Sequence, residues 1–146
     1  MSTLADDTTI KDDEILWRRI LPRQGATIDW YKYENGEWRP SSLAFLDTRS
    51  PTHSLSAYIS SETELGRLRT DYQEDNIAGF AARVPRAFAY TIQRVPEAGY
   101  ESHVEITPPA DIWGHGNQKR KRRKEAARAM AKAAHWVYCR DCNETV

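Results

Sequence analysis

Six consecutive cations, from Lys119 to Lys124, form the strongest chemical signal in this sequence. Lys and Arg side chains bind phosphate groups, and the planar guanidinium of Arg does so with two parallel N–H donors. Arg128 and Lys132 follow on the same segment, so we expect phosphate contacts from Lys119, Arg120, Lys121, Arg122, Arg123, Lys124, Arg128 and Lys132. Contacts of this kind hold a nucleic acid without reading its sequence. The segment therefore predicts a docking surface for RNA or DNA, or for an acidic protein surface.

The cations stand at the start of a predicted helix. Residues 117–138 are rich in strong helix formers, and Asn117 is a suitable N-cap residue. One apolar stripe of this amphipathic helix consists of Ala126, Met130, Ala133 and Val137. Positive charge at a helix N-terminus opposes the helix dipole by about 0.3–1 kcal/mol per charge. The first turns therefore unwind into a basic arm, or an anion binds there, or the charge run is simply solvated.

A second set of polar residues points to catalysis rather than to docking. Alternation along residues 100–107 puts Glu101, His103 and Glu105 on one side of a predicted strand. A histidine between two carboxylates can act as a general acid or base, and the three side chains can also hold a divalent ion. The alternative for these three residues is the polar, solvent-facing side of an edge strand.

The order of several polar residues resembles that of ADP-ribosyltransferases, which are small mixed domains that use NAD. The arginine-type pattern has an Arg on an early strand, then a Ser-x-Ser strand, then a segment with glutamate. Here the order is Arg18 or Arg19, then Ser54-Leu-Ser56, then Glu62-Thr-Glu64 or Glu105. The resemblance implies that the arginine binds the NAD phosphates, the serines support the site and the glutamate orients the ribose. In this alternative, a small nucleotide-acting enzyme, the catalytic residues are Arg19, Ser54, Ser56, His103 and Glu105.

Both cysteines lie near the end of the chain, as Cys139 and Cys142, and His135 precedes Cys139 by four positions. These three residues are all zinc ligands, whereas a structural zinc site has four. The CxxC spacing also occurs in redox motifs, which normally begin a helix after a strand. A zinc site, a redox pair and two free thiols remain open for the cysteines. We expect no other cofactor, apart from NAD if the protein is an enzyme.

Charge is distributed unevenly over the chain. The formal net charge is zero, but residues 1–14 carry five acids and one base, a net −4, and residues 117–138 carry eight bases and one acid, a net +7. A neutral total argues against avid, non-specific DNA binding, which usually requires a basic domain. No apolar run approaches the length of a membrane span, and the N-terminus does not resemble a signal peptide. We therefore expect a cytoplasmic protein that does not enter a membrane.

Alternation and turn residues predict the elements that position these side chains. We expect strands over residues 15–21, 54–59, 77–84, 87–95 and 100–107, a hairpin turn at Asn35-Gly36, and a capped helix from Glu62 to about Tyr72. The fold class is α+β: a single small domain with a mainly antiparallel sheet of four to five strands and two helices. Its parts are a disordered acidic arm over residues 1–13, the domain over residues 14–138 and a tail over residues 139–146. A subunit of a larger assembly is the last alternative for its function.

Overall fold

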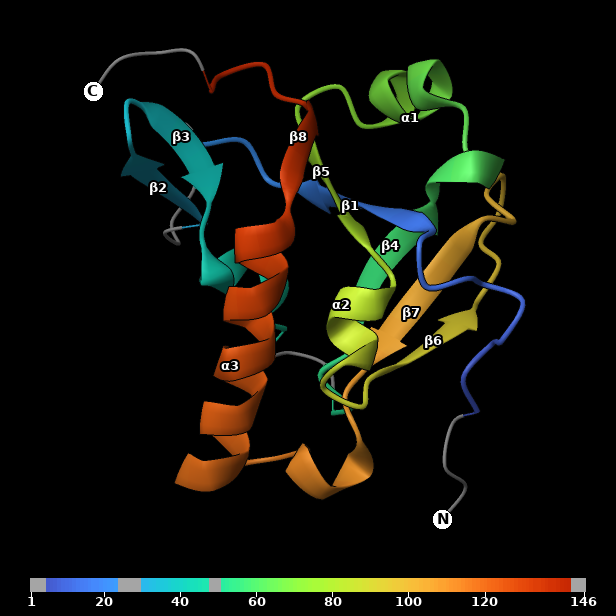
Figure 1. The fold of residues 1–146 in the computed structure, drawn as a ribbon. Helices are drawn as coiled ribbons and strands as arrows, with labels where there is room; N and C mark the ends of the chain where they lie inside the picture. The colour runs from blue at the N-terminus through green and yellow to red at the C-terminus, as the bar shows by residue number, and fades with distance from the viewer. Residues whose placement is uncertain (1–4, 24–29, 48–50, 143–146) are drawn as a thin grey trace.

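The computed structural model describes residues 5–23, 30–47 and 51–142. Its centre is an antiparallel sheet of six strands in the order β6-β7-β4-β1-β5-β8 (Figure 1). The strands are β1 (Ile15–Ile20), β4 (Leu55–Ile59), β5 (Asn76–Ala81), β6 (Thr91–Arg94), β7 (His103–Thr107) and β8 (His135–Tyr138). A separate hairpin pairs β2 (Tyr31–Glu34) with β3 (Glu37–Pro40). The α+β class and the antiparallel sheet are confirmed, and the sheet is larger than the predicted four to five strands.

Three α-helices accompany the sheet in the described residues: α1 (Leu65–Asp71), α2 (Arg83–Arg86) and α3 (Asn117–Ala133). Short 3-10 turns, η1 (Ser42–Phe45), η2 (Ser60–Glu62) and η3 (Ala110–Ile112), connect the elements. The longest helix, α3, contacts η1, α2 and η3 and lies along one face of the sheet (Figure 1). The sequence predicts two helices, and α2 is the additional one; it interrupts a region that alternation assigned to two longer strands.

The apolar face of the sheet packs against α3. Phe80 of β5 and Ile106 of β7 are 1% and 0% exposed, and Met130 of α3 is 0% exposed. Ala126 and Ala127 are buried on the same side of the helix. Because these side chains are small, the backbone of α3 can lie close to the sheet. The packing of this amphipathic face, rather than helix propensity alone, stabilises α3.

The N-terminal segment of residues 5–13 packs on the domain. Ile10 is 2% exposed and belongs to the hydrophobic core. Carboxylates of the segment form ion pairs with two arginines: Asp6 and Asp12 with Arg86, and Asp7 with Arg94. The sequence predicts disorder over residues 1–13, whereas these contacts order the part that the structure describes, from residue 5 onward. Within the described residues, the acidic segment is therefore paired with arginines outside α3.

Helix α3 ends earlier than the sequence predicts. It stops at Ala133, and residues 135–138 form β8 beside β5. The guanidinium of Arg39 donates hydrogen bonds to the carbonyls of Ala131 and Ala134, at 3.2 and 2.8 Å. These carbonyls are among those that a helix C-terminus leaves without partners. Val137 is consequently part of a strand and not of the helical apolar stripe, because β-branched and aromatic residues favour strands.

Candidate nucleic-acid interface

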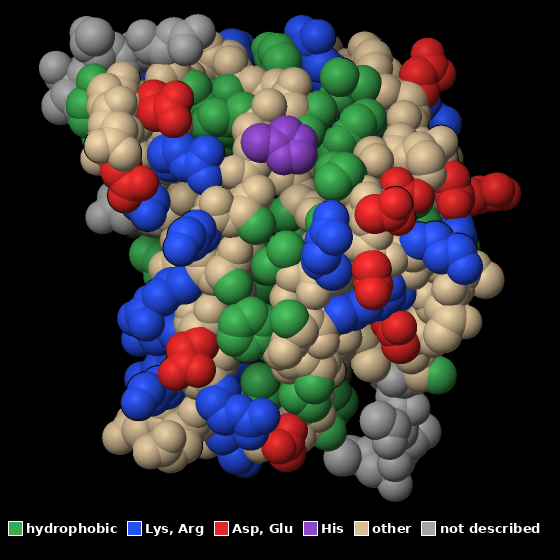
Figure 2. Space-filling model, viewed as in Figure 1, with side chains coloured by type: hydrophobic (Ala, Val, Ile, Leu, Met, Phe, Trp, Pro, Cys, Tyr) green, Lys and Arg blue, Asp and Glu red, His purple; other side chains and the backbone are tan. Residues whose placement is uncertain are grey.

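Four cations form a line on the outward face of α3. Lys121, Lys124, Arg128 and Lys132 are exposed, and their spacing of i, i+3, i+7 and i+11 puts them on one side of the helix. At 1.5 Å of rise per residue, the line is about 16 Å long. None of the four forms an ion pair or side-chain hydrogen bond with another residue in the described ranges. Figure 2 shows Lys and Arg side chains gathered along α3, and we call these four residues the basic stripe.

The remaining four residues of the predicted phosphate-binding set have three different environments. Lys119 and Arg120 are exposed near the start of α3. The Arg122 guanidinium pairs with the Asp111 carboxylate at 3.1 Å, and both side chains are exposed. Arg123 turns inward: it is only 6% exposed. The structure therefore leaves six of the eight cations exposed and without an acidic partner among the described residues.

The buried side chain of Arg123 forms hydrogen bonds within the protein. Its guanidinium donates hydrogen bonds to the carbonyls of Ile112 and Gly114, the second at 2.9 Å. Burial lowers the pKa of this guanidinium from its usual value, because desolvation penalises the charged form. These contacts tie the loop before α3 to the second turn of the helix. Arg123 therefore faces away from any ligand on the basic stripe.

The first turn of α3 has no side-chain cap. Asn117 is the first helical residue rather than the N-cap; Gly116 stands at the cap position, with a φ of 131°. The first turn contains no acidic side chain either. The N-terminal N–H groups and the helix dipole therefore favour an anion, next to the exposed Lys119 and Arg120. The helix is formed from Asn117 onward, so the alternative of an unwound basic arm does not describe this structure.

A groove lies between the β2–β3 hairpin and the C-terminal half of α3. It has a volume of about 700 Å³ and is lined by Lys32, Glu34, Asn35, Glu37, Arg39, Ser41, Ser42, Arg128, Ala131 and Lys132. Two members of the basic stripe, Arg128 and Lys132, thus border the groove. No sequence pattern marks the hairpin residues as part of a binding site. Alternation alone shows that they share one side of a hairpin, but only the fold shows that this side faces α3.

Three residues of the predicted catalytic set lie near one another. Arg19, Ser56 and Glu105 belong to the adjacent strands β1, β4 and β7. Ser56 pairs with Glu105 across the sheet, and its hydroxyl donates to the Glu105 carboxylate at 3.4 Å. Arg19 and Ser56 line a second cavity of about 260 Å³. The Arg19 guanidinium is engaged within the protein: it pairs with Asp75 at 2.7 Å and lies 3.6 Å from the centre of the Tyr72 ring.

The other two predicted catalytic residues have partners in the fold. The Ser54 hydroxyl shares a hydrogen bond with the Thr107 hydroxyl at 2.8 Å. His103 is 1% exposed, and its Nδ1 donates to the Val95 carbonyl at 2.8 Å. The Nε2 of the same ring lies 3.5 Å from a carboxylate oxygen of Glu97, so both ring nitrogens of His103 have partners within the protein. Arg18 is the alternative arginine in the ADP-ribosyltransferase pattern. Its guanidinium donates hydrogen bonds to the carbonyls of Ala44 and Ser56.

The half-buried carboxylate of Glu105 is expected to lower the stability of the fold when it is ionised. Burial raises the pKa of the Glu105 carboxyl above the ordinary 4.5, since desolvation disfavours the anion. The folded state then binds the proton more tightly than the unfolded state, so stability falls as the pH rises past the unfolded pKa. We expect Glu105→Gln to raise the melting temperature at pH 7 and to have little effect at about pH 4. The exposed Glu101→Gln is the control, and a lower melting temperature for Glu105→Gln at pH 7 would contradict the prediction.

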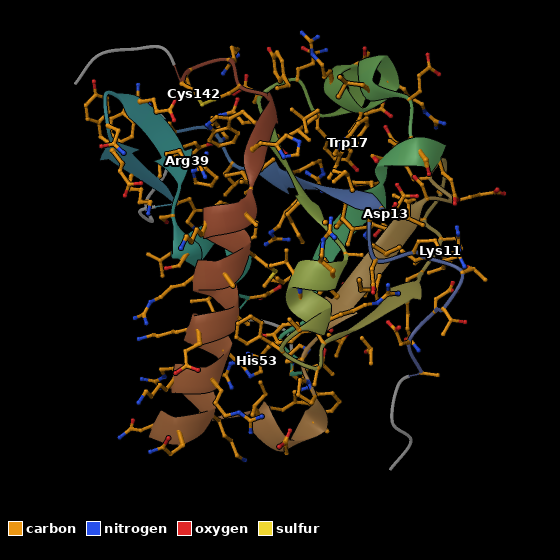
Figure 3. All side chains as sticks on the ribbon, viewed as in Figure 1. Lys11, Asp13, Trp17, Arg39, His53 and Cys142 are labelled. Carbon is orange, nitrogen blue, oxygen red and sulfur yellow. A yellow bond between two sulfur atoms is a disulfide. The ribbon has the colours of Figure 1, made fainter. Side chains whose placement is uncertain are left out.

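The cysteine pair forms a disulfide. Cys139 and Cys142 are bonded, with their Cα atoms 5.6 Å apart (Figure 3). Their sulfur atoms and the Asp141 carboxylate lie within 4.8 Å of one another. Zinc binds thiolates, so it would require the reduced pair, which is the usual form in a reducing compartment. His135, the third residue of the predicted zinc set, pairs with Gly79 on β5 and does not belong to this group.

No model of a known protein family matches this chain, and no curated protein and no solved structure is significantly similar to it. The resemblance to ADP-ribosyltransferases therefore rests on the order of a few residues. Within the described ranges, no helix is both long enough and apolar enough to cross a membrane. The interpretation of the site depends on its own geometry, and the basic stripe is its most distinctive feature.

Proposed function

We propose that this protein binds the sugar-phosphate backbone of a nucleic acid through the outward face of α3. The exposed, unpaired basic stripe is the observation that carries the proposal. A helix whose charged face is only solvated commonly carries acids three or four residues from its bases, since such pairs stabilise the helix. Helix α3 contains one acid, Glu125, among its eight bases. Among the described residues, only Arg122 of these bases has an acidic partner, Asp111, and the cations of the first turns oppose the helix dipole. An external anion is therefore the natural partner of the remaining exposed cations.

The dimensions of the basic stripe suit a phosphate backbone. Phosphates follow one another at about 3.4 Å of axial rise along one strand of a duplex, so a line of about 16 Å faces about five of them. The uncapped N-terminus of α3 adds backbone N–H donors at one end of this line. Contacts to phosphates fix the position of the nucleic acid and carry no sequence information. We therefore expect weak sequence specificity.

Salt dependence tests this proposal directly. If the four residues of the basic stripe each neutralise one phosphate, raising the salt concentration from 50 to 200 mM weakens binding about 50-fold for a single strand and about 150-fold for a duplex. Fluorescence anisotropy with labelled RNA and DNA measures this change. Equal affinity at the two salt concentrations, or no binding at either, would contradict the proposal. Binding to an acidic protein but to neither nucleic acid would favour the acidic surface as the partner instead.

The cytoplasmic location expected from the sequence is part of this proposal, because RNA is abundant in the cytoplasm.

One observation favours a second candidate function, a nucleotide-acting enzyme that uses NAD: Arg19 and Ser56 share a cavity, and Glu105 is hydrogen-bonded to Ser56. The engagement of Arg19 by Asp75 weighs against it, since that guanidinium is not free to bind phosphate. Incubation with NAD, followed by mass spectrometry, tests it, and unchanged NAD would remove this candidate.

A further inference from the structure

The groove beside the basic stripe has two walls of different charge. The hairpin turns one side toward α3, because Arg39 on that side hydrogen-bonds the helix C-terminus. The same side of the hairpin carries Lys32, Glu34 and Glu37. In the register of the two strands, Lys32 lies opposite Arg39 and Glu34 lies opposite Glu37. Arg128 and Lys132 form the opposite wall, on α3. Figure 3 shows Arg39 between the hairpin and the helix.

The groove is held open by contacts that do not involve a ligand. Besides the hydrogen bonds from Arg39, the indole N–H of Trp136 donates to the Trp38 carbonyl at 2.9 Å. These bonds fix the hairpin to both α3 and β8. The volume of about 700 Å³ is within the usual range of about 300–1,000 Å³ for ligand pockets. A ligand that enters the groove therefore does not pay the entropic cost of ordering its walls.

Three charged groups of the groove remain available to a ligand. The Lys32 ammonium is 3.2 Å from the Glu34 carboxylate, and Arg39 is occupied with the helix carbonyls. Arg128, Lys132 and Glu37 have no ion pair or side-chain hydrogen bond with another described residue. The groove thus presents two cations on the helix wall and a carboxylate on the hairpin wall. A matching ligand carries an anion and, close to it, a hydrogen-bond donor.

We propose that this groove makes the protein prefer RNA to DNA, through a hydrogen bond from a ribose 2′-hydroxyl to the Glu37 carboxylate. This inference rests on the proposed function: the same strand binds Arg128 and Lys132 through its phosphates. RNA places a 2′-hydroxyl donor next to each phosphate, and this hydroxyl is what distinguishes it from DNA. The deoxyribose of DNA offers no donor there, so Glu37 only repels the neighbouring phosphates.

The test compares three labelled single strands of one sequence: RNA, DNA and 2′-O-methyl RNA. The methylated strand keeps the ribose oxygen but has lost its donor hydrogen. We expect the full-length protein to bind RNA about tenfold more tightly than either of the others, the effect of one hydrogen bond to a charged group at a partly exposed site. Equal affinity for RNA and 2′-O-methyl RNA would overturn the inference, because shape alone would then explain any preference over DNA.

A pair of variants separates the hydrogen bond from general charge. Glu37→Ala removes both the acceptor and the repulsion, so its affinities for RNA and DNA are expected to become equal. Glu125→Ala is the matched control, since it removes one exposed carboxylate from α3 outside the groove. It should strengthen binding to all three strands equally and leave the RNA preference intact. A preserved preference in Glu37→Ala would overturn the inference.

The outcomes also distinguish this inference from the proposed function. Salt-dependent binding with equal affinity for all three strands would remove the role of Glu37 and leave the docking of α3 on nucleic acid intact. Absence of binding to every strand would remove both.

Discussion

Reversing the basic stripe, by changing all four of its residues to Glu, is expected to abolish nucleic-acid binding and to leave the fold intact. An exposed ion pair contributes up to about 1 kcal/mol. Four lost contacts therefore correspond to about 4 kcal/mol, or about 1,000-fold in affinity, before the added repulsion. Anisotropy titrations at 50 mM salt measure this loss. The variant should remain folded, because the four side chains are exposed. Lys121→Glu and Lys124→Glu place acids in the N-terminal half of α3, which the helix dipole favours, whereas Lys132→Glu places one in the last turn, which the dipole disfavours by about 0.3–1 kcal/mol.

A matched pair of double variants separates the location of charge from its total. Lys124→Glu with Arg128→Glu changes the net charge by −4, two units for each substitution. Lys11→Glu with Arg83→Glu makes the same change at exposed positions outside α3, and Figure 3 shows Lys11 far from that helix. We expect a large loss of affinity only from the first double variant. Equal losses from both would mean that overall charge, rather than the basic stripe, governs binding.

The parts of the fold that follow from local chemistry could be predicted from the sequence. The Asn35-Gly36 turn is one example: both residues have positive φ, at 53° and 81°, as a tight hairpin turn between right-twisted strands requires. The basic, amphipathic character of α3 is another, since it depends on the spacing of residues within one segment. The basic stripe could be derived in the same way, because Lys121, Lys124 and Arg128 share a side of any helix built from this sequence.

The features that depend on distant contacts could not be predicted. Residues 5–13 have the composition of a disordered segment, yet Arg86 and Arg94 form ion pairs with three of its four carboxylates, and Ile10 is buried in the core. Helix α3 stops at Ala133 because the following residues pair with β5 and because Arg39 satisfies its last carbonyls. The groove has the same origin. Its two walls are some ninety positions apart in sequence, as the Arg39–Ala131 hydrogen bond shows.

Arg123 is a case in which local chemistry was available but ambiguous. Its spacing of i, i+3 and i+7 to Ala126 and Met130 places it on the buried side of α3. Within a run of six cations, however, residue type gives no sign that one of them differs from the others. Its burial is possible because the charged guanidinium donates hydrogen bonds to two carbonyls of the segment that precedes α3, those of Ile112 and Gly114.

Replacing Arg123 with Ala is expected to destabilise the protein by about 3 kcal/mol, because hydrogen bonds from charged groups contribute about 1.5–3 kcal/mol each and two are lost. Nucleic-acid binding by the folded variant should be unchanged, since Arg123 faces the core. Urea denaturation measures the first effect, and anisotropy measures the second under conditions in which the variant is folded. Arg123→Lys keeps the charge but cannot donate from a planar fork, so an intermediate loss of stability is expected.

The neighbouring Lys124 should behave in the opposite way. Lys124→Ala is expected to change the free energy of unfolding by no more than about 0.5 kcal/mol, as is usual for an exposed side chain. It should weaken nucleic-acid binding about fivefold, which corresponds to one exposed phosphate contact of about 1 kcal/mol. A result in which Arg123→Ala weakens binding without loss of stability would mean that Arg123 reaches the ligand. Arg123 and Lys124, two adjacent cations, would then both bind the ligand. The geometry of α3 instead assigns Arg123 to the core and Lys124 to the interface.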